Sequence, residues 1–480
     1  MRSGLIALLC SALLTMAAPA PLWAHGKLKS STPAAGAHLA QVPLQLRLEF
    51  TESVELAFTL VRLASASGQQ IALAPLALAT DSRRAVVVPI TGAMDASAYV
   101  VTWQVAGDDG HPVRGRFEFV VAPGATGAGS TTVVTSRMHH DPVTMPEGNG
   151  FGAESGLYVV VRWLQFISLL LVIGAVSFRF FVLGRLPGAS MPESGHAVAA
   201  LAPDAARRAA GWGLVAANAL AATLPLRLAA QSYAMHGASV FDASLIGSMI
   251  RTTVWGWGWL LQLAGVVLAV AGFHGVRSAS RNVLRPGAAR GRGPSAWWGL
   301  AACGAVVAAF SPALSGHASG SPRLRSLAIV SDGVHVLGAS AWLGTLAILL
   351  VAGVAAATGQ GREQRGMLVR SLVTAFSPVA LASAGIAAAT GVFASWLHIG
   401  TIPNLWGTRY GITLLIKLGI LGIVALTGFY NWRFVQPRLG TDEATMRLQR
   451  SSRLEVAVAV LVLLVTAVLV ASPTSMDGAT

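Results

Sequence analysis

The sequence predicts a protein of two parts: an N-terminal all-β sandwich of the immunoglobulin-like or cupredoxin-like kind, and a C-terminal all-α polytopic membrane bundle of about eight transmembrane helices. Two observations support this. Hydrophobic residues make up 54% of the 480 residues and charged residues only 11%, and the mean hydropathy is +0.62, which is too apolar for a soluble protein of this length. The apolar excess begins near Leu157, whereas the stretch from Lys27 to Val121 has an ordinary globular composition.

Residues 1–24 are predicted to be a secretory signal peptide. Arg2 supplies its positive start, residues 5–16 its apolar core, and Ala24 the small residue at the cleavage point, so that the mature chain begins at His25. Cleavage after Ala20 is the alternative, although a proline would then follow the cut. Of the two cysteines, one leaves with the signal and the other lies in a predicted span, so we expect no disulfide.

Residues 25–121 are predicted to form the sandwich, because apolar and polar residues alternate with period two over 44–50 and 117–121. Further short apolar runs are separated by Ser, Gly and Asp clusters, which predicts about seven antiparallel strands in all. These runs lie at 57–63, 85–89 and 99–105. Residues 122–155 turn to Gly, Ala, Thr and Pro, which is typical of a flexible linker that lets the sandwich move.

The remaining part, 156–473, holds about eight apolar segments, each long enough to cross roughly 30 Å of hydrocarbon. They lie at 157–183, 209–231, 253–273, 296–313, 327–357, 371–397, 410–432 and 454–472. Most surplus Lys and Arg falls in alternate loops, which are therefore expected inside the cell. The net charge of +14 thus indicates membrane orientation rather than a nucleic-acid partner. We expect a multi-pass protein of a bacterial inner membrane, with its N-terminal domain in the periplasm.

The sandwich carries a candidate metal site that begins at the mature N-terminus. Cleavage at Ala24 frees an amine beside the His25 imidazole, His111 supplies a third nitrogen, and Asp109 supplies an oxygen. Nitrogen-rich tetragonal sites suit Cu(II), whereas zinc prefers tetrahedral ligands. The alternative is an Asp-Gly turn with an incidental histidine.

The same residues resemble a known family. His25-Gly26-Lys27-Leu28, Ser31-Thr32-Pro33, Phe50-Thr51-Glu52 and Asp109-Gly110-His111-Pro112-Val113 are similar to the CopC family of periplasmic copper chaperones. The resemblance implies that His25, Asp109 and His111 bind Cu(II), with Glu52 near the site. Some family members add a methionine-rich loop for Cu(I), but residues 64–81 contain no methionine, so we expect only Cu(II) in the sandwich.

The membrane part resembles the CopD family, which is often fused to CopC. The residues that carry the resemblance are Ser315-Gly316-His317-Ala318, Asp332-Gly-Val-His335 with Trp342-Leu-Gly344, and Tyr410-Gly411 with Lys417 and Asn431. Asp332 and His335 are three apart on a helix and share a face, and an ionisable pair inside a span indicates function. We expect His317 to join them in a copper entry site for Cu(I) or Cu(II). The alternative is a pair that only packs the bundle.

Other polar residues near the predicted spans receive weaker interpretations. Lys417 lies deep enough for a structural or gating ion pair, but the sequence names no partner. His236, which follows Met235, and His398 lie near outer span ends at the same predicted periplasmic level as His317. Soft Met and imidazole ligands suit Cu(I), but each histidine alone is more typical of a surface residue. Arg162, Arg227 and Arg251 lie near span ends and are expected to snorkel into the interface.

The sequence therefore predicts copper binding in the periplasm and copper transport across the membrane. Nucleotide-binding and phosphorylation motifs do not occur in the sequence, so we expect no enzyme activity, and we expect gradient-driven or facilitated transport. The expected partners are copper ions, the lipid bilayer and periplasmic copper chaperones. Two alternatives stay open: a haem-binding membrane redox protein, and periplasmic copper sequestration or sensing without transport.

Overall fold

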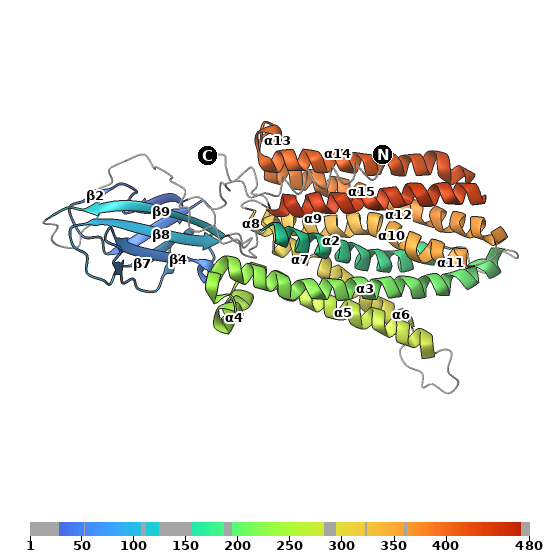
Figure 1. Cartoon of the computed structure of the whole chain (residues 1–480), viewed down its shortest axis with the longest axis horizontal. Coiled ribbons are helices and arrows are strands. Elements are labelled where there is room, and N and C mark those ends of the chain that lie inside the picture. Colours follow the sequence, from blue (N-terminus) through green and yellow to red (C-terminus); the bar gives the residue numbers. More distant parts are fainter. Residues whose placement is uncertain are drawn as a thin grey trace.

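The computed structural model describes residues 28–51, 53–106, 112–123, 155–186, 194–282, 294–321, 324–359 and 362–471. They form a β-sandwich and an elongated helical bundle, and the sandwich sits at one end of the bundle (Figure 1). We call this end of the bundle the sandwich side and the opposite end the far side. The predicted two-part fold is confirmed.

The strands of the sandwich form two sheets, with the orders β1-β3-β7-β6 and β2-β9-β8-β4-β5. All pairs are antiparallel except β2 with β9. The strands are β1 (Leu28–Thr32), β2 (His38–Leu39), β3 (Gln45–Phe50), β4 (Leu60–Ser65), β5 (Gln70–Ile71), β6 (Ala77–Ala79), β7 (Ser82–Pro89), β8 (Ala98–Ala106) and β9 (Pro112–Val121). The sequence predicts fewer strands because β2, β5 and β6 are too short to show a period-two pattern. The predicted strand at 57–63 begins only at Leu60, after the 3-10 turn η1 (Leu56–Phe58).

Apolar side chains from both sheets meet in one core. Leu46, Leu48 and Phe50 point inward from β3, as the alternation predicts. The Phe50 ring meets the edge of Trp103 on β8, with centroids 5.1 Å apart. Gly115 on β9 pairs with Trp103, and a Cβ there would lie 2.4 Å from the indole, so only glycine fits. This packing fixes the strand ends that lead to the predicted copper ligands.

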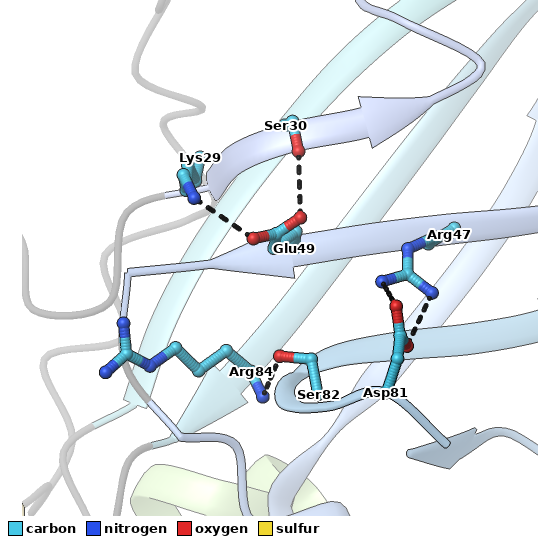
Figure 2. Close-up of polar contacts among 7 residues, drawn as sticks. All are labelled: Lys29, Ser30, Arg47, Glu49, Asp81, Ser82 and Arg84. Carbon is cyan, nitrogen blue, oxygen red and sulfur yellow. Dashed lines mark hydrogen bonds and ion pairs between the residues drawn. The ribbon is translucent and has the colours of Figure 1, made fainter. Parts of the chain in front are cut away.

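Polar residues on the outer face of the first sheet tie its strands together (Figure 2). Lys29 on β1 donates a 3.1 Å hydrogen bond to Glu49 on β3. Arg47 on β3 forms a two-bond pair with Asp81 before β7, at 3.1 and 2.8 Å. These hydrogen bonds hold the pKa of Asp81 below its usual value. The first described strand is therefore anchored three residues after the predicted mature N-terminus.

Eight helical segments in the described part of the chain are long and apolar enough to cross a membrane, which confirms the predicted number. They are Gly156–Arg185, Ala200–His236, Val254–Ser280, Pro294–Leu314, Arg325–Thr358, Gln364–Ile399, Arg409–Arg438 and Glu443–Ala471. Several extend beyond the predicted limits, because helices continue past the apolar run. The last helix, for example, begins at Asp442, whereas its apolar run begins near position 454.

The segments are built from α2 (Gly156–Ser177), α3 (Ser194–His236), α5 (Val254–Asn282), α6 (Pro294–Ala309), α7 (Ser311–Leu314), α9 (Arg325–Ala339), α10 (Thr345–Ile348), α11 (Ala355–Thr358), α12 (Arg362–Ile399), α14 (Arg409–Tyr430) and α15 (Asp442–Ala471). Short helices α4 (Ala243–Thr252), α8 (His317–Gly320) and α13 (Asn404–Gly407) lie between them. The turn η4 (Gly237–Ser239) follows α3.

Small residues let the first helices approach closely. A Cβ on Gly265 or Gly272 of α5 would meet the backbone of α6 at Ala308 or Ala301, at 2.7 and 2.4 Å. Gly304 of α6 meets α5 in the same way. Such contacts replace hydrophobic burial as the main attraction between helices in lipid. This half of the bundle is therefore tightly packed.

Two spans end in the same irregular way on the far side. The first passes from α2 into a π-helix, η2 (Phe178–Val182), and a 3-10 turn, η3 (Leu183–Arg185). The seventh passes from α14 into a π-helix, η7 (Asn431–Val435), and a 3-10 turn, η8 (Gln436–Arg438). The fifth span also contains π-helices, η5 (Ser340–Gly344) and η6 (Leu349–Val354). Single π-turns inside helices are frequently found at functional sites.

The sandwich contacts the bundle directly. Gln104 on β8 donates to the carbonyl of Met235 at 3.0 Å, and Arg114 on β9 donates to that of Ala234 at 3.0 Å. An apolar cluster adds to these bonds, made of Phe58, Ala106, Met235, Met249 and Trp255. The sandwich is thus docked on the end of α3 and on α4. Most of the predicted linker lies outside the described residues.

Candidate functional site

The four predicted copper ligands of the sandwich, His25, Glu52, Asp109 and His111, lie outside the described residues. Their described neighbours in the chain still fix where each segment leaves the sandwich. Leu28 pairs with Phe50 at the shared end of β1 and β3, and Ala106 pairs with Pro112 at the shared end of β8 and β9.

These two strand ends lie together. The Glu55 N–H, in the segment that follows β3, donates a 3.0 Å hydrogen bond to the Ala106 carbonyl at the end of β8. The flanks of all four predicted ligands therefore gather at one end of the sandwich. Ala106 also packs against Met235, Met249 and Trp255, so this end faces the bundle.

Three aromatic rings meet on the sandwich side of the bundle. His317 at the start of α8 lies 6.0 Å from His398 at the end of α12, measured between ring centroids. Tyr410 at the start of α14 lies 6.3 Å from the first ring and 6.4 Å from the second. We call these three residues the ring cluster. His398 belongs to a site with another histidine, which the sequence does not indicate because the two are 81 positions apart.

A second polar group lies deeper, between α9, α12 and α14. Asp332 interacts electrostatically with Lys417, which supplies the partner that the sequence could not name. His335 also interacts electrostatically with Lys417. The Nδ1 of His335 lies 3.0 Å from the Ala387 carbonyl and 3.0 Å from the Thr390 hydroxyl. Asp332 and His335 lie about seven and ten positions after the start of α9, which is roughly 10–15 Å along the helix.

The orientation of His335 has a chemical consequence. A carbonyl only accepts hydrogen bonds, and the Thr390 hydroxyl donates its proton to Ile386 at 2.7 Å. Nδ1 must therefore carry the proton that both acceptors share. The other ring nitrogen of a neutral imidazole then keeps its lone pair, which is the form that binds metals.

Family comparisons match both the sandwich and most of the bundle. The CopC domain matches residues 28–122, the copper resistance protein D-like N-terminal domain residues 153–323, and copper resistance protein D residues 370–469. The chain belongs to the CopC/CopD copper-resistance family. The ring cluster and Lys417 fall within the CopD matches, whereas Asp332 and His335 lie in the interval between them.

Individual proteins are similar to all or part of the chain. The copper transport protein CutJ of Bacillus subtilis (strain 168) is 23% identical over 463 residues, which cover 96% of this chain and 76% of that protein. Protein YobA of Escherichia coli (strain K12) is 30% identical over 111 residues, 23% of this chain and 90% of that protein. The crystal structure of CopC from Methylosinus trichosporium OB3b matches at 27% identity with a TM-score of 0.20, over 21% of this chain and 98% of that one.

The predicted membrane ligands do not lie together in the CopD part. Among the described residues, no three His, Cys, Asp or Glu side chains form a group that could hold a metal ion. His317 meets His398 and Tyr410, whereas Asp332 and His335 face Lys417 and α12. His317, Asp332 and His335 were predicted to form one site, but they lie in two separate groups at two depths. The three-residue spacing on α9 aligns two side chains but carries no information about a separate short helix.

Two of the three arginines near span ends, Arg162 and Arg227, are buried and so differ from the prediction. Arg251 is exposed, but Arg227 is only 4% exposed. Arg227 donates to the Gln262 side chain and to the Ser315 hydroxyl, and it lies over the Trp255 ring. It therefore joins α3, α5 and the segment before α8 instead of snorkelling.

Sequence reasoning also missed a buried acid in the CopD part. Glu455 on α15 is 4% exposed and accepts a 3.1 Å hydrogen bond from Asn431. The only signal available was one acidic residue at the border of an apolar run, beside three arginines that resemble an ordinary inner loop.

Proposed function

We propose that this CopC/CopD protein binds Cu(II) at its sandwich in the periplasm and passes copper through the bundle across the inner membrane. The CopC domain would hold Cu(II) with the amine and imidazole of His25, with Asp109 and with His111, and Glu52 would lie nearby. The observation that carries the proposal is that the flanks of these ligands share the sandwich end that contacts the bundle. Copper released there needs no soluble carrier to reach the membrane.

The ring cluster is the proposed acceptor on the bundle. Metal–nitrogen bonds are about 2.0–2.1 Å long, so two imidazoles with centroids 6.0 Å apart can bind one ion between them. A two-imidazole site suits copper, and Tyr410 shields one side of it. His317 comes from α8 and His398 from α12, so ion binding would also link the short helix between the fourth and fifth spans to the sixth span.

The deeper group is the proposed next position along the path. Asp332 offers a carboxylate and His335 a ring nitrogen with a free lone pair, while Lys417 neutralises the acid when copper is absent. An arriving cation would compete with Lys417 for Asp332. This arrangement explains why a costly ionisable pair is kept within a span.

Copper uptake into proteoliposomes tests the path. We expect the wild-type protein to load vesicles with copper and the His317→Ala/His398→Ala double variant to lose at least about 90% of the rate, because both ligands of one site are removed. His274→Ala is the matched control, since His274 is an exposed histidine on α5 outside either group. Equal uptake by wild type and double variant would reject the ring cluster as the entry site.

Two further measurements examine the rest of the proposal. The Cu(II) electron paramagnetic resonance signal of the full chain should lose its nitrogen-rich tetragonal form in His111→Ala. Intact-mass analysis should show a mature chain that begins at His25. Cu(II) binding without any vesicle uptake would support sequestration, and a Soret band in the purified protein would support the haem alternative.

A further inference from the structure

The seventh span, α14 and the start of η7, carries inward-facing polar residues at three depths. Tyr410 is in the ring cluster, Lys417 interacts electrostatically with Asp332, and Asn431 donates a hydrogen bond to Glu455 on α15. Their spacings are seven and fourteen residues, and a heptad spacing returns a helix to nearly the same face. The proposed function uses the first two positions. The third, on the far side, has no role in it.

Glu455 lies in a small polar site enclosed by two helices. The side-chain amide of Asn431 donates a 3.1 Å hydrogen bond to the Glu455 carboxyl. The Ser451 hydroxyl donates a 2.5 Å hydrogen bond to the side-chain oxygen of Asn431. A Cβ on Gly428 would lie 3.3 Å from the carboxyl oxygen, so glycine provides the room for the acid. Asn431 is also the first residue of the π-helix η7, where the regular bonding of α14 ends.

No cation neutralises Glu455 within the described residues. None of the described charged groups on the elements around it forms an ion pair with it. The exposed ones are Arg370 on α12, Arg433 on η7, Arg438 on η8, and Glu443, Arg447, Arg450 and Arg453 on α15. The buried or half-buried ones are Arg162 on α2, Arg365 on α12, and Arg409 and Lys417 on α14. A buried carboxylate with one neutral hydrogen-bond donor is costly, so the protonated carboxyl is the stable form at rest.

Open space borders the π-helix on the far side. A surface cavity of about 360 Å³ is lined by Trp432 and Arg433, the two residues after Asn431, together with Arg370 of α12. Water can therefore approach η7 from that side. The polar site therefore has a group that can hold a proton, and the cavity reaches the two residues that follow Asn431.

We propose that Glu455 is a proton-binding site that exchanges its proton with the aqueous phase on the far side and thereby controls copper release there. Only the carboxyl O–H bond breaks and re-forms, and the proton passes to and from water. The ionised carboxylate attracts a departing copper cation, whereas the neutral carboxyl does not. This inference rests on the proposed copper transport and extends it to the exit.

Carbodiimide labelling tests the proton site without any transport measurement. Dicyclohexylcarbodiimide reacts with protonated carboxyls in apolar surroundings, so Glu455 in the full chain in membranes should be modified at about pH 6 and severalfold less at about pH 8. Glu443 is the matched control, because it lies on the same helix but is exposed and paired with Arg447 at 2.6 Å. Absence of label on Glu455 at the lower pH would overturn the proposal.

The pH dependence of copper uptake tests the coupling. With the far-side pH varied, wild-type uptake should rise severalfold from about pH 6 to about pH 8, and Glu455→Gln should stay at the low rate at both. Glu455→Asp keeps a titratable group and should keep the rise. A Glu455→Gln profile that rises like the wild type would refute the coupling. Failure of the wild type to transport copper at all would instead refute the proposed function, while the labelling result would stand.

Discussion

Arg227 and Lys417 both lie inside the bundle, and their charges are balanced in different ways. Arg227, in the first half, is bound only by neutral groups, the Gln262 amide oxygen and the Ser315 hydroxyl, with the Trp255 ring beneath it. Lys417, in the second half, faces the acid Asp332 and acts on His335 as well. The first arrangement surrounds its charge with neutral polar groups, whereas the second brings three ionisable side chains together.

Within one membrane domain, the network around Arg227 serves stability, whereas the group around Lys417 can take part in chemistry. An arginine stays charged under all ordinary conditions, so a neutral network around it forms a permanent tie between α3, α5 and the chain before α8. Lysine, aspartate and histidine respond to a passing cation or proton. We therefore expect changes at Arg227 to affect stability, and changes around Lys417 to affect transport as well.

The largest effect is expected from Arg227→Met. It removes two charge-assisted hydrogen bonds worth roughly 1.5–3 kcal/mol each, so the bundle should lose about 3–5 kcal/mol of unfolding free energy. Thermal unfolding of the full chain in detergent measures this. Arg251→Met, at an exposed arginine of α4, is the control and should change stability by less than about 0.5 kcal/mol. Equal melting temperatures of the two variants would contradict the structural role of Arg227.

A smaller loss of stability is expected from Asp332→Asn, which leaves Lys417 without its acid. We expect a cost of about 2–3 kcal/mol, because one partner of an intramembrane charge pair is left alone. The double variant Asp332→Asn/Lys417→Met should recover most of that stability but not copper uptake. A double variant that is as unstable as the sum of the single variants would show that the two side chains do not act as a pair.

Thr390→Val sharpens the comparison by altering only the orientation of His335. The ring loses one of its two acceptors but keeps the Ala387 carbonyl, so we expect a cost of about 1 kcal/mol, or roughly fivefold slower copper uptake. Thr427→Val, at a hydroxyl that bonds only its own helix on α14, is the control. Unchanged uptake in Thr390→Val would mean that the threonine does not position the ring.

The smallest effect is expected from a charge pair in water. Arg47 holds the pKa of Asp81 below its usual value, so the pair stabilises the sandwich above the unfolded pKa of about 3.9 and loses this contribution as the pH falls through the lower folded value. Asp81→Asn should therefore flatten the acid limb of the unfolding curve slightly and leave neutral stability almost unchanged. A large loss at neutral pH would contradict the weak role of exposed pairs.

The sequence could predict those features that depend on neighbours along the chain. Alternation over 44–50 places Leu46, Leu48 and Phe50 in the core, and apolar runs identify eight spans. It failed where the partners are distant. His398 is read alone as a surface histidine, yet it lies 6.0 Å from His317. Arg227 is read as an interfacial residue, yet it is buried among polar groups of other helices.

By itself, the sequence determined the two-part fold and the membrane character, because hydrophobic periodicity and run length decide which solvent each segment can enter. The tertiary structure alone decided which polar groups meet: the two histidines of the ring cluster, Asp332 with Lys417, and Glu455 with Asn431. The physical reason is that helix packing sets contacts between residues far apart in the chain, and no local pattern records the rotation or depth at which two helices face each other.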